Sequence, residues 1–293
     1  MDRFAQQHAT IDALSRKQLF FIGGSMKSGT TWLRLLLDAH PEIICGGEAH
    51  LMDHFGPLLL ELLAKRKDYL ADKNRLFGEL GGFPTPTPDD LTYMLSASLY
   101  LALGSAGVPH SVRAVGEKTP DNIRYFDVLH AVFPAARFIH LVRDGRDCAV
   151  SGWFHNLRAS PEWTRTHFAT LADYTAAFAR EWTKDLSLGQ EFAAAHPDAT
   201  LTLRYEDLIE APEALLAQVA AFLGADPAAD LVGACCAQAR FETLTNGRPR
   251  GVEDPASFLR KAAPGDWRNH LDAVAEDTFM TTAGDAMRAF AYA

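Results

Sequence analysis

The sequence predicts an α/β protein with a central parallel β-sheet flanked by helices, organised as one domain over residues 1–293. Three observations support this. Short apolar runs alternate with longer helical stretches. Polar and glycine-containing turns follow the runs. The composition, with 48% hydrophobic and 22% charged residues, is typical of a globular protein with a substantial core. Ligands of such sheets bind at the carboxyl ends of the strands.

Short apolar runs bounded by turn residues predict five strands. They cover residues 18–24, 43–45, 112–116, 137–142 and 200–204. The first ends in Gly23-Gly24. The fourth is the strongest, because Pro134 precedes it and Asp144-Gly145 follows it.

Helix-forming residues with apolar periodicity fill most of the intervals between these strands. Helices are predicted over residues 28–38, 122–132, 146–156, 170–195, 212–223, 227–239 and 275–290, and over most of residues 56–105. Gly81-Gly82 and the following prolines predict a loop inside the last of these ranges. Residues 158–167 and 245–267 are also expected to be loops.

The totals exclude several functional classes. A net charge of -9 argues against a general nucleic-acid binder. The four cysteines form no C-x-x-C pair and the 11 histidines show no metal-binding spacing, so we expect neither disulfides nor a metal. Met1–Thr10 lacks the apolar core of a secretory signal, and no apolar run is long enough to span a bilayer. We therefore expect a cytoplasmic protein, whose oligomeric state the sequence leaves open.

A candidate phosphate-binding turn follows the first strand. The segment Gly23-Gly24-Ser25-Met26-Lys27-Ser28-Gly29-Thr30-Thr31-Trp32 links this strand to the first predicted helix. The turn exposes backbone N–H groups, the helix N-terminus adds positive potential, and Lys27 adds a full charge. The lysine precedes Ser-Gly-Thr-Thr, so this is not a Walker A loop, G-x-x-x-x-G-K-[ST]. The alternative is an ordinary helix start.

A second candidate anion site follows the fourth strand. Arg143 ends that strand, and Ser151 lies eight residues later, about two helical turns along the next helix. A guanidinium and a hydroxyl at this spacing can bind one phosphate. Taken alone, Arg143 can equally form a surface ion pair with Asp144 or Asp147.

Together the two motifs resemble the sulfotransferases that use 3′-phosphoadenosine 5′-phosphosulfate (PAPS) and release 3′-phosphoadenosine 5′-phosphate (PAP). The resemblance implies the P-loop-type sulfotransferase fold, with the run Lys27 to Trp32 as 5′-phosphosulfate loop and Arg143 with Ser151 as 3′-phosphate pair. It runs over nearly the whole chain, from about residue 19 to about residue 290. It also implies nucleotide contacts from Tyr205, in the segment Arg-Tyr-Glu-Asp-Leu, from the adenine-stacking Phe241, and from Arg260 and Lys261, in Phe-Leu-Arg-Lys.

Three departures from the cytosolic members of that family are visible. Ala262 replaces the glycine of their Arg-Lys-Gly segment, which places the tight turn there in question. Arg240 precedes Phe241, where small hydroxyl residues are usual. Pro120 stands where those members carry a catalytic histidine.

A different base is therefore expected. The segment His40 to His50 is similar to heparan-type sulfotransferases, in which a glutamate two residues before a histidine is the base. This maps onto Glu48, with His50 as the alternative, and Lys118 in Lys-Thr-Pro is expected to balance charge on the sulfuryl group.

The expected reaction is therefore in-line transfer of a sulfuryl group from PAPS to a hydroxyl or amine of a small molecule, sugar or lipid. The sequence does not identify the acceptor. We expect residues 50–111 and 158–167 to shape its pocket. Two alternatives remain open: a nucleotide-dependent kinase, although Walker A spacing is missing, and a nucleotide-binding module without catalysis.

Overall fold

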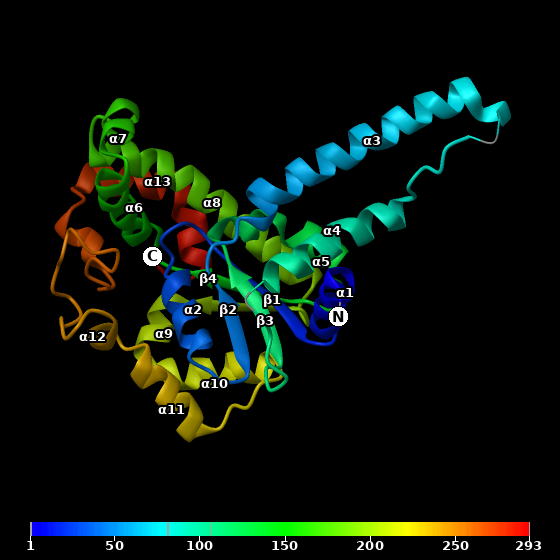
Figure 1. The fold of residues 1–293 in the computed structure, drawn as a ribbon. Coiled ribbons are helices and arrows are strands. Elements are labelled where there is room, and N and C mark those ends of the chain that lie inside the picture. Colours follow the sequence, from blue (N-terminus) through cyan, green and yellow to red (C-terminus); the bar gives the residue numbers. More distant parts are fainter. Residues whose placement is uncertain (1, 81, 106, 293) are drawn as a thin grey trace.

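The computed structural model describes residues 2–80, 82–105 and 107–292. Its centre is a five-stranded sheet in which all neighbouring strands are parallel, in the order β2-β3-β1-β4-β5 (Figure 1). The predicted fold class is confirmed. The strands are β1 (Gln18–Gly23), β2 (Ile43–Gly46), β3 (Ala114–Lys118), β4 (Arg137–Val142) and β5 (Thr200–Arg204).

Helices cover both faces of the sheet, because alternate side chains of each strand point to opposite sides. On β1, Phe20 and Ile22 pack with α2 and α9 to α11, whereas Leu19 and Phe21 pack with α1, α4 and α5. A third apolar cluster joins α6, α8 and α13 beside the end of β4. The helices are α1 (Arg3–Ser15), α2 (Thr30–Asp38), α3 (Gly56–Phe77), α4 (Pro88–Leu103), α5 (Phe126–Val132), α6 (Gly145–Ala159), α7 (Pro161–His167), α8 (Leu171–Ala195), α9 (Tyr205–Glu210), α10 (Pro212–Phe222), α11 (Ala229–Gln238), α12 (Phe241–Leu244) and α13 (Ala273–Ala289).

Two segments differ from the sequence prediction. Residues 158–167 are not a loop, because α7 occupies most of them, with Pro161 at its first position. None of the described residues of 51–111 lines the ligand cavity, since α3 and the start of α4 form an arm that points away from the body, while the second half of α4 packs on the core (Figure 1). Of the predicted loop inside this arm, Gly81 lies outside the described residues. Within the described ranges, no helix combines the length and the apolar character needed to cross a membrane.

His140, in the middle of β4, is buried, and its ring nitrogens have no hydrogen-bond partner among the described residues. Burial lowers its pKa to about 4, which keeps the ring neutral.

Candidate functional site

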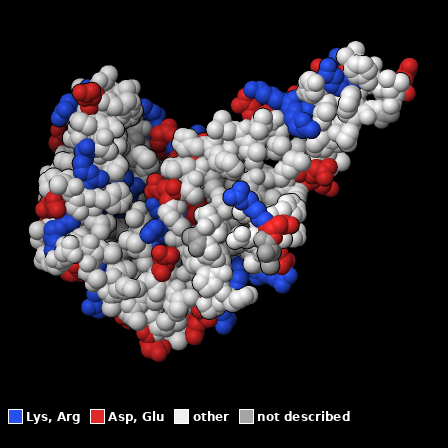
Figure 2. All heavy atoms as spheres, in the orientation of Figure 1, with Lys and Arg blue, Asp and Glu red and all other residues white. Residues whose placement is uncertain are grey.

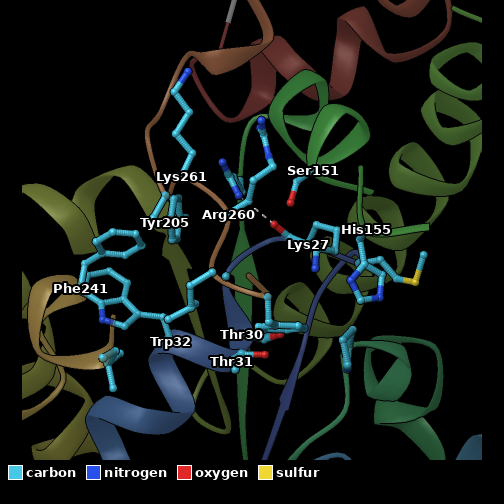
Figure 3. Close-up of a pocket in the computed structure, with 18 of the residues that line it drawn as sticks. Lys27, Thr30, Thr31, Trp32, Ser151, His155, Tyr205, Phe241, Arg260 and Lys261 are labelled. Atoms are coloured by element: carbon cyan, nitrogen blue, oxygen red, sulfur yellow. Dashed lines mark hydrogen bonds between the residues drawn. The ribbon is translucent and has the colours of Figure 1, made fainter. Parts of the chain in front are cut away.

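The turn between β1 and α2 forms one wall of a cavity of about 310 Å³ at the carboxyl edge of the sheet (Figure 3). Gly24 is required there, because a Cβ would lie 2.3 Å from a carbonyl oxygen of β4. Gly29, with φ 97°, precedes α2, and a Cβ would press on the ring of Tyr205. Thr30 and Thr31 begin α2 and line the cavity. The first N–H groups of this helix are therefore placed to bind an anion.

Lys27 lies in this turn and has a left-handed backbone conformation, with φ 67°. Strain of this kind concentrates at functional sites. Its Nζ lies 4.6 Å from the ring centre of Phe258. Burial, together with the charges of Arg158 and Arg143, lowers the pKa of Lys27 to about 8. An anion bound beside the ammonium group would stabilise its charged form and raise this pKa again.

Arg143 directly follows β4 and faces the same cavity as Ser151 of α6. Its Nη1 donates a hydrogen bond of 3.1 Å to the carbonyl of Lys27, and its guanidinium lies 4.5 Å from the ring centre of Tyr205. The surface ion pair considered as an alternative is wrong, because Arg143 is buried and the carboxylate of Asp147, at 3.7 Å, is buried as well.

The long loop between α12 and α13 supplies the opposite wall. Arg260 and Lys261 line the cavity, and both contact the carboxylate of Asp266. Burial alone would raise the pKa of Asp266, but hydrogen bonds from these partners hold it well below its ordinary value. The turn questioned at residue 262 is present, because Ala262 adopts the left-handed φ of 53° that a glycine would take.

An aromatic corner closes the end of the cavity beside α12. Trp32, Tyr205 and Phe241 line it, and the Trp32 and Tyr205 rings meet edge to face at 6.0 Å. Arg250, which the sequence analysis did not single out, lies 4.9 Å from the Trp32 ring and 5.5 Å from the Phe241 ring. A flat base can stack in such a corner.

The candidate base residues come from the segment after β2. Glu48 and His50 line the cavity, and the Glu48 carboxylate forms an ion pair with Lys118, whose Nζ also donates to Thr31 Oγ1 at 3.1 Å. His50 Nδ1 lies 2.6 Å from Asp53 Oδ2, and its Nε2 lies 3.8 Å from Glu48 Oε2. The hydrogen bond with Asp53 is the main reason that the pKa of His50 is raised.

A buried carboxylate holds this segment in place. Glu117 of β3 is 1% exposed; it accepts hydrogen bonds from Thr119 Oγ1 at 2.8 Å, from Asn122 Nδ2 at 2.6 Å and from the N–H of Ala49 at 3.5 Å. Burial raises the pKa of Glu117. Ala49 lies between Glu48 and His50, and Glu117 is next to Lys118 in β3. The hydrogen bond from Ala49 to Glu117 therefore holds the backbone of the two candidate bases close to Lys118. The sequence analysis did not find this role, because its third strand ended at residue 116, whereas β3 includes Glu117.

Most of the predicted site residues therefore meet around one cavity. The members that line it are Lys27, Gly29, Thr30, Thr31, Trp32, Glu48, His50, Arg143, Ser151, Tyr205, Phe241, Arg260 and Lys261. Two others do not line it. Lys118 lies behind Thr31 and Glu48, and Ser28 is fully buried below the turn.

Sequence reasoning missed several lining residues, notably Asp121, His155, Arg250 and Phe258. His155 was detectable, since it lies one helical turn after Ser151 on α6. Burial, Lys27 and Arg158 lower its pKa to about 4, so the ring is neutral at pH 7. Phe258 begins the Phe-Leu-Arg-Lys segment, in which only Arg260 and Lys261 were singled out, and Arg250 reaches the cavity through the path of the long loop, which no local pattern predicts.

One group in the described ranges offers three metal-ligand atoms within 4.8 Å of one another, namely His50, Asp53 and His54. Asp53 already contacts both histidine rings, at 2.6 and 3.8 Å. The expectation that the protein needs no metal stays a prediction.

Comparisons with known proteins concern the family and the fold. Residues 20–230 match the model of the sulfotransferase family. Protein-tyrosine sulfotransferase 1 of Danio rerio is 28% identical over 209 residues, which are 70% of this chain and 52% of that protein. The human protein of the same name is 35% identical over 128 residues, 44% of this chain and 32% of that protein. The chain thus spans about half the length, or less, of the curated relatives it matches.

Solved structures support the fold. A mouse sulfotransferase complexed with PAP superposes with a TM-score of 0.56 and 16% identity, covering 96% of this chain and 89% of that one. A sulfotransferase from Mycobacterium avium gives a TM-score of 0.56 and 13% identity, covering 98% of this chain and 80% of that one. With a family model that matches most of its length, the chain belongs to the sulfotransferase family.

Proposed function

We propose that the chain transfers a sulfuryl group from PAPS to a hydroxyl or amine of an acceptor. The observation that carries this proposal is the meeting of two cationic, hydroxyl-bearing groups of residues in one cavity. One is the turn with Lys27 and Thr30, and the other is Arg143 with Ser151. PAPS carries anionic groups at both ends of its ribose, so it needs two such sites. The relatives and the PAP-bound neighbours support the same donor.

In this proposal the acceptor oxygen or nitrogen attacks sulfur while the bond from sulfur to the bridging phosphate oxygen breaks. The electron pair of that bond stays on the phosphate of PAP. Lys27, Thr30 and the first N–H groups of α2 stabilise this growing charge, which is the type of interaction that accelerates transfer. Lys118 holds Thr31 and Glu48 beside the transferred group.

The acceptor proton passes to Glu48, with His50 as the alternative base. Two contacts favour Glu48. It lines the cavity and pairs with Lys118, and the hydrogen bond of His50 with Asp53 raises the pKa of that ring, so fewer of the rings are free to accept a proton near neutral pH. The proposed acceptor is a small molecule, sugar, lipid or tyrosyl peptide, and the proposed location is the cytoplasm.

The test is incubation with PAPS labelled in its sulfur, together with pooled phenols, alcohols, amines, sugars and tyrosyl peptides. Labelled products are then identified by mass. We expect one acceptor class to take up label with the wild-type chain, and turnover to fall by about 10²–10³ with Lys27→Ala. Tight PAP binding without transfer to any acceptor would favour a nucleotide-binding module instead.

A further inference from the structure

His155 of α6 lines the cavity, but the reaction proposed above gives it no role. It lies one helical turn after Ser151. Figure 3 shows it next to Lys27 and away from the aromatic corner. Both residues contact Phe258: Nζ of Lys27 lies 4.6 Å from the centre of that ring, and the His155 ring centre lies 5.8 Å from it. The imidazole is therefore at the end of the cavity where we propose that transfer occurs.

One ring nitrogen of His155 already has a partner. Nη2 of Arg158 lies 3.1 Å from Nδ1 of His155. A guanidinium can donate hydrogen bonds but cannot accept them, so Nδ1 must be the unprotonated, accepting nitrogen of the ring. A neutral imidazole with this arrangement carries its proton on Nε2. The contact with Arg158 therefore makes the other nitrogen of His155 a hydrogen-bond donor.

The surroundings of the ring keep it neutral. Burial and the charges of Lys27 and Arg158 lower the pKa of His155 to about 4, while the charge of Glu48 acts in the opposite direction. On the face seen in Figure 2, basic and acidic side chains are interspersed, so the nearest charges decide the state of this ring. At pH 7 the imidazole is therefore a neutral donor and a poor base.

The charges that act on His155 belong to the two ends of the proposed reaction. In an in-line transfer, sulfur lies between the leaving oxygen, proposed to be stabilised by Lys27, and the acceptor atom, whose proton is proposed to pass to Glu48. The remaining oxygens of the sulfuryl group point sideways from this line. His155 lies close enough to feel both charges, and it comes from a third element, α6. A donor on its ring is therefore placed beside the sulfur.

We propose that the Nε2–H of His155 donates a hydrogen bond to an oxygen of the sulfuryl group of PAPS, and that Arg158 is the positioning residue that keeps the proton on this nitrogen. The inference rests on the proposed function, which brings PAPS into the cavity. The ring keeps its proton throughout, and its hydrogen bond orients the sulfur for in-line attack. A neutral donor does this without adding another full charge beside Lys27.

Substitution of His155 tests the donor. His155→Phe keeps a ring but removes the N–H group, so we expect turnover to fall by roughly tenfold to a hundredfold, as for the loss of one hydrogen bond to a charged group. The affinity for PAP, which lacks the sulfuryl group, should change little. His155→Gln places an N–H group about where Nε2 lies and should restore most of the turnover. His167→Phe, at an exposed histidine of α7 outside the cavity, is the matched control and should leave turnover and affinity unchanged.

Nitrogen NMR of the histidine rings tests the role of Arg158. The signals of His155 are assigned by their loss in His155→Phe, and we expect the wild-type ring to be neutral at pH 7 with its proton on Nε2. Arg158→Met removes the donor to Nδ1, so both neutral forms of the ring should then be populated. A wild-type ring that is charged at pH 7, or that carries its proton on Nδ1, would contradict the proposal. Equal losses of turnover and of PAP affinity in His155→Phe would also overturn it, because the ring would then only shape the cavity.

The same NMR signals separate this inference from the proposed function. PAPS added to the wild-type chain without an acceptor should shift the Nε2 signal of His155, and PAP should shift it much less, because the two nucleotides differ only in the sulfuryl group. If PAPS gives this shift but no acceptor takes up label, the transfer activity is wrong and the contact of His155 stands. If label is transferred but PAPS and PAP affect the ring alike, the proposal for His155 is overturned and the transfer activity stands. A chain that binds neither nucleotide would overturn both.

Discussion

At the scale of single residues, Lys27 combines a full charge with a buried position. Its pKa is lowered to about 8, so the side chain loses its proton as the pH rises through that value. The charged form is the one that binds an anion, and PAP should bind less tightly as the pH rises past 8. Calorimetric titration with PAP on both sides of pH 8 measures this change.

The matched variant is Lys27→Arg, whose guanidinium stays charged throughout this range. We expect its PAP affinity to show little pH dependence. A wild-type affinity that stays constant through pH 8 would contradict the placement of Lys27 against the bound anion.

Single substitutions also distinguish the two candidate bases, Glu48 and His50. Glu48→Gln keeps the size of the side chain but removes its basicity, so we expect kcat to fall by about 10²–10⁴ and PAP affinity to change little. His50→Ala should cost much less. Initial rates on an aliphatic alcohol acceptor, which needs full help in losing its proton, give the clearest comparison. If Glu48→Gln stays near the wild-type rate while His50→Ala is inactive, His50 is the base.

Local sequence patterns found these residues because each follows a strand. Arg143 and Tyr205 come directly after β4 and β5, Lys27 lies in the turn after β1, and the carboxyl ends of parallel strands meet at one edge. The structure also pairs Glu48 with Lys118, two residues that the sequence analysis placed in the site separately. No pattern predicted that Glu117 would hold both segments, because that contact depends on the register of β2 with β3.

At the scale of elements, one carboxylate of α6 holds the long loop after α12 by hydrogen bonds to its backbone. Asp147 accepts hydrogen bonds from the N–H of Gly265 at 2.7 Å and of Trp267 at 2.9 Å, and it lies 3.7 Å from the guanidinium of Arg143. It therefore joins the wall that carries Arg260 to the strand that carries Arg143.

We expect Asp147→Asn to weaken PAP binding, because the amide can accept only one of the two backbone hydrogen bonds and no longer offsets Arg143. A charge-assisted hydrogen bond contributes about 1.5–3 kcal/mol, so the loss should be roughly tenfold or more. Calorimetry on the folded variant measures it, with thermal unfolding as a check on the fold. An unchanged PAP affinity would show that the loop is held without Asp147.

Prediction of the elements was strongest where apolar runs were short and sharply bounded. β4 and β5 have the predicted limits, and α8 begins one residue later than predicted. The sequence analysis missed α1, since only Leu14 is buried along it and its apolar periodicity is weak. It also missed α7, a seven-residue polar helix without a side-chain cap at its start. Both omissions follow from the same cause: little apolar surface is buried there.

At the scale of the whole molecule, the cavity is assembled from both ends of the chain, from residue 26 to residue 266. The sequence predicted the sheet and its ligand-binding edge from strand–helix alternation. It did not predict where the 56–105 segment points, because periodicity defines a helix but not its direction in space. Of the described residues of 50–111, only His50 lines the cavity, and the expectation that this range shapes the acceptor pocket stays a prediction.

The central claim is that the cavity binds a nucleotide with phosphates at both the 5′ and the 3′ positions. The most direct measurement compares PAP with adenosine 5′-monophosphate by calorimetry, in the wild-type chain and in Arg143→Ala. We predict tighter wild-type binding of PAP without magnesium, by roughly tenfold to a hundredfold, since the 3′-phosphate gains a charge-assisted contact. Arg143→Ala should remove most of that difference. Equal affinities for the two nucleotides in the wild-type chain, or tighter binding of ATP with magnesium, would contradict the account.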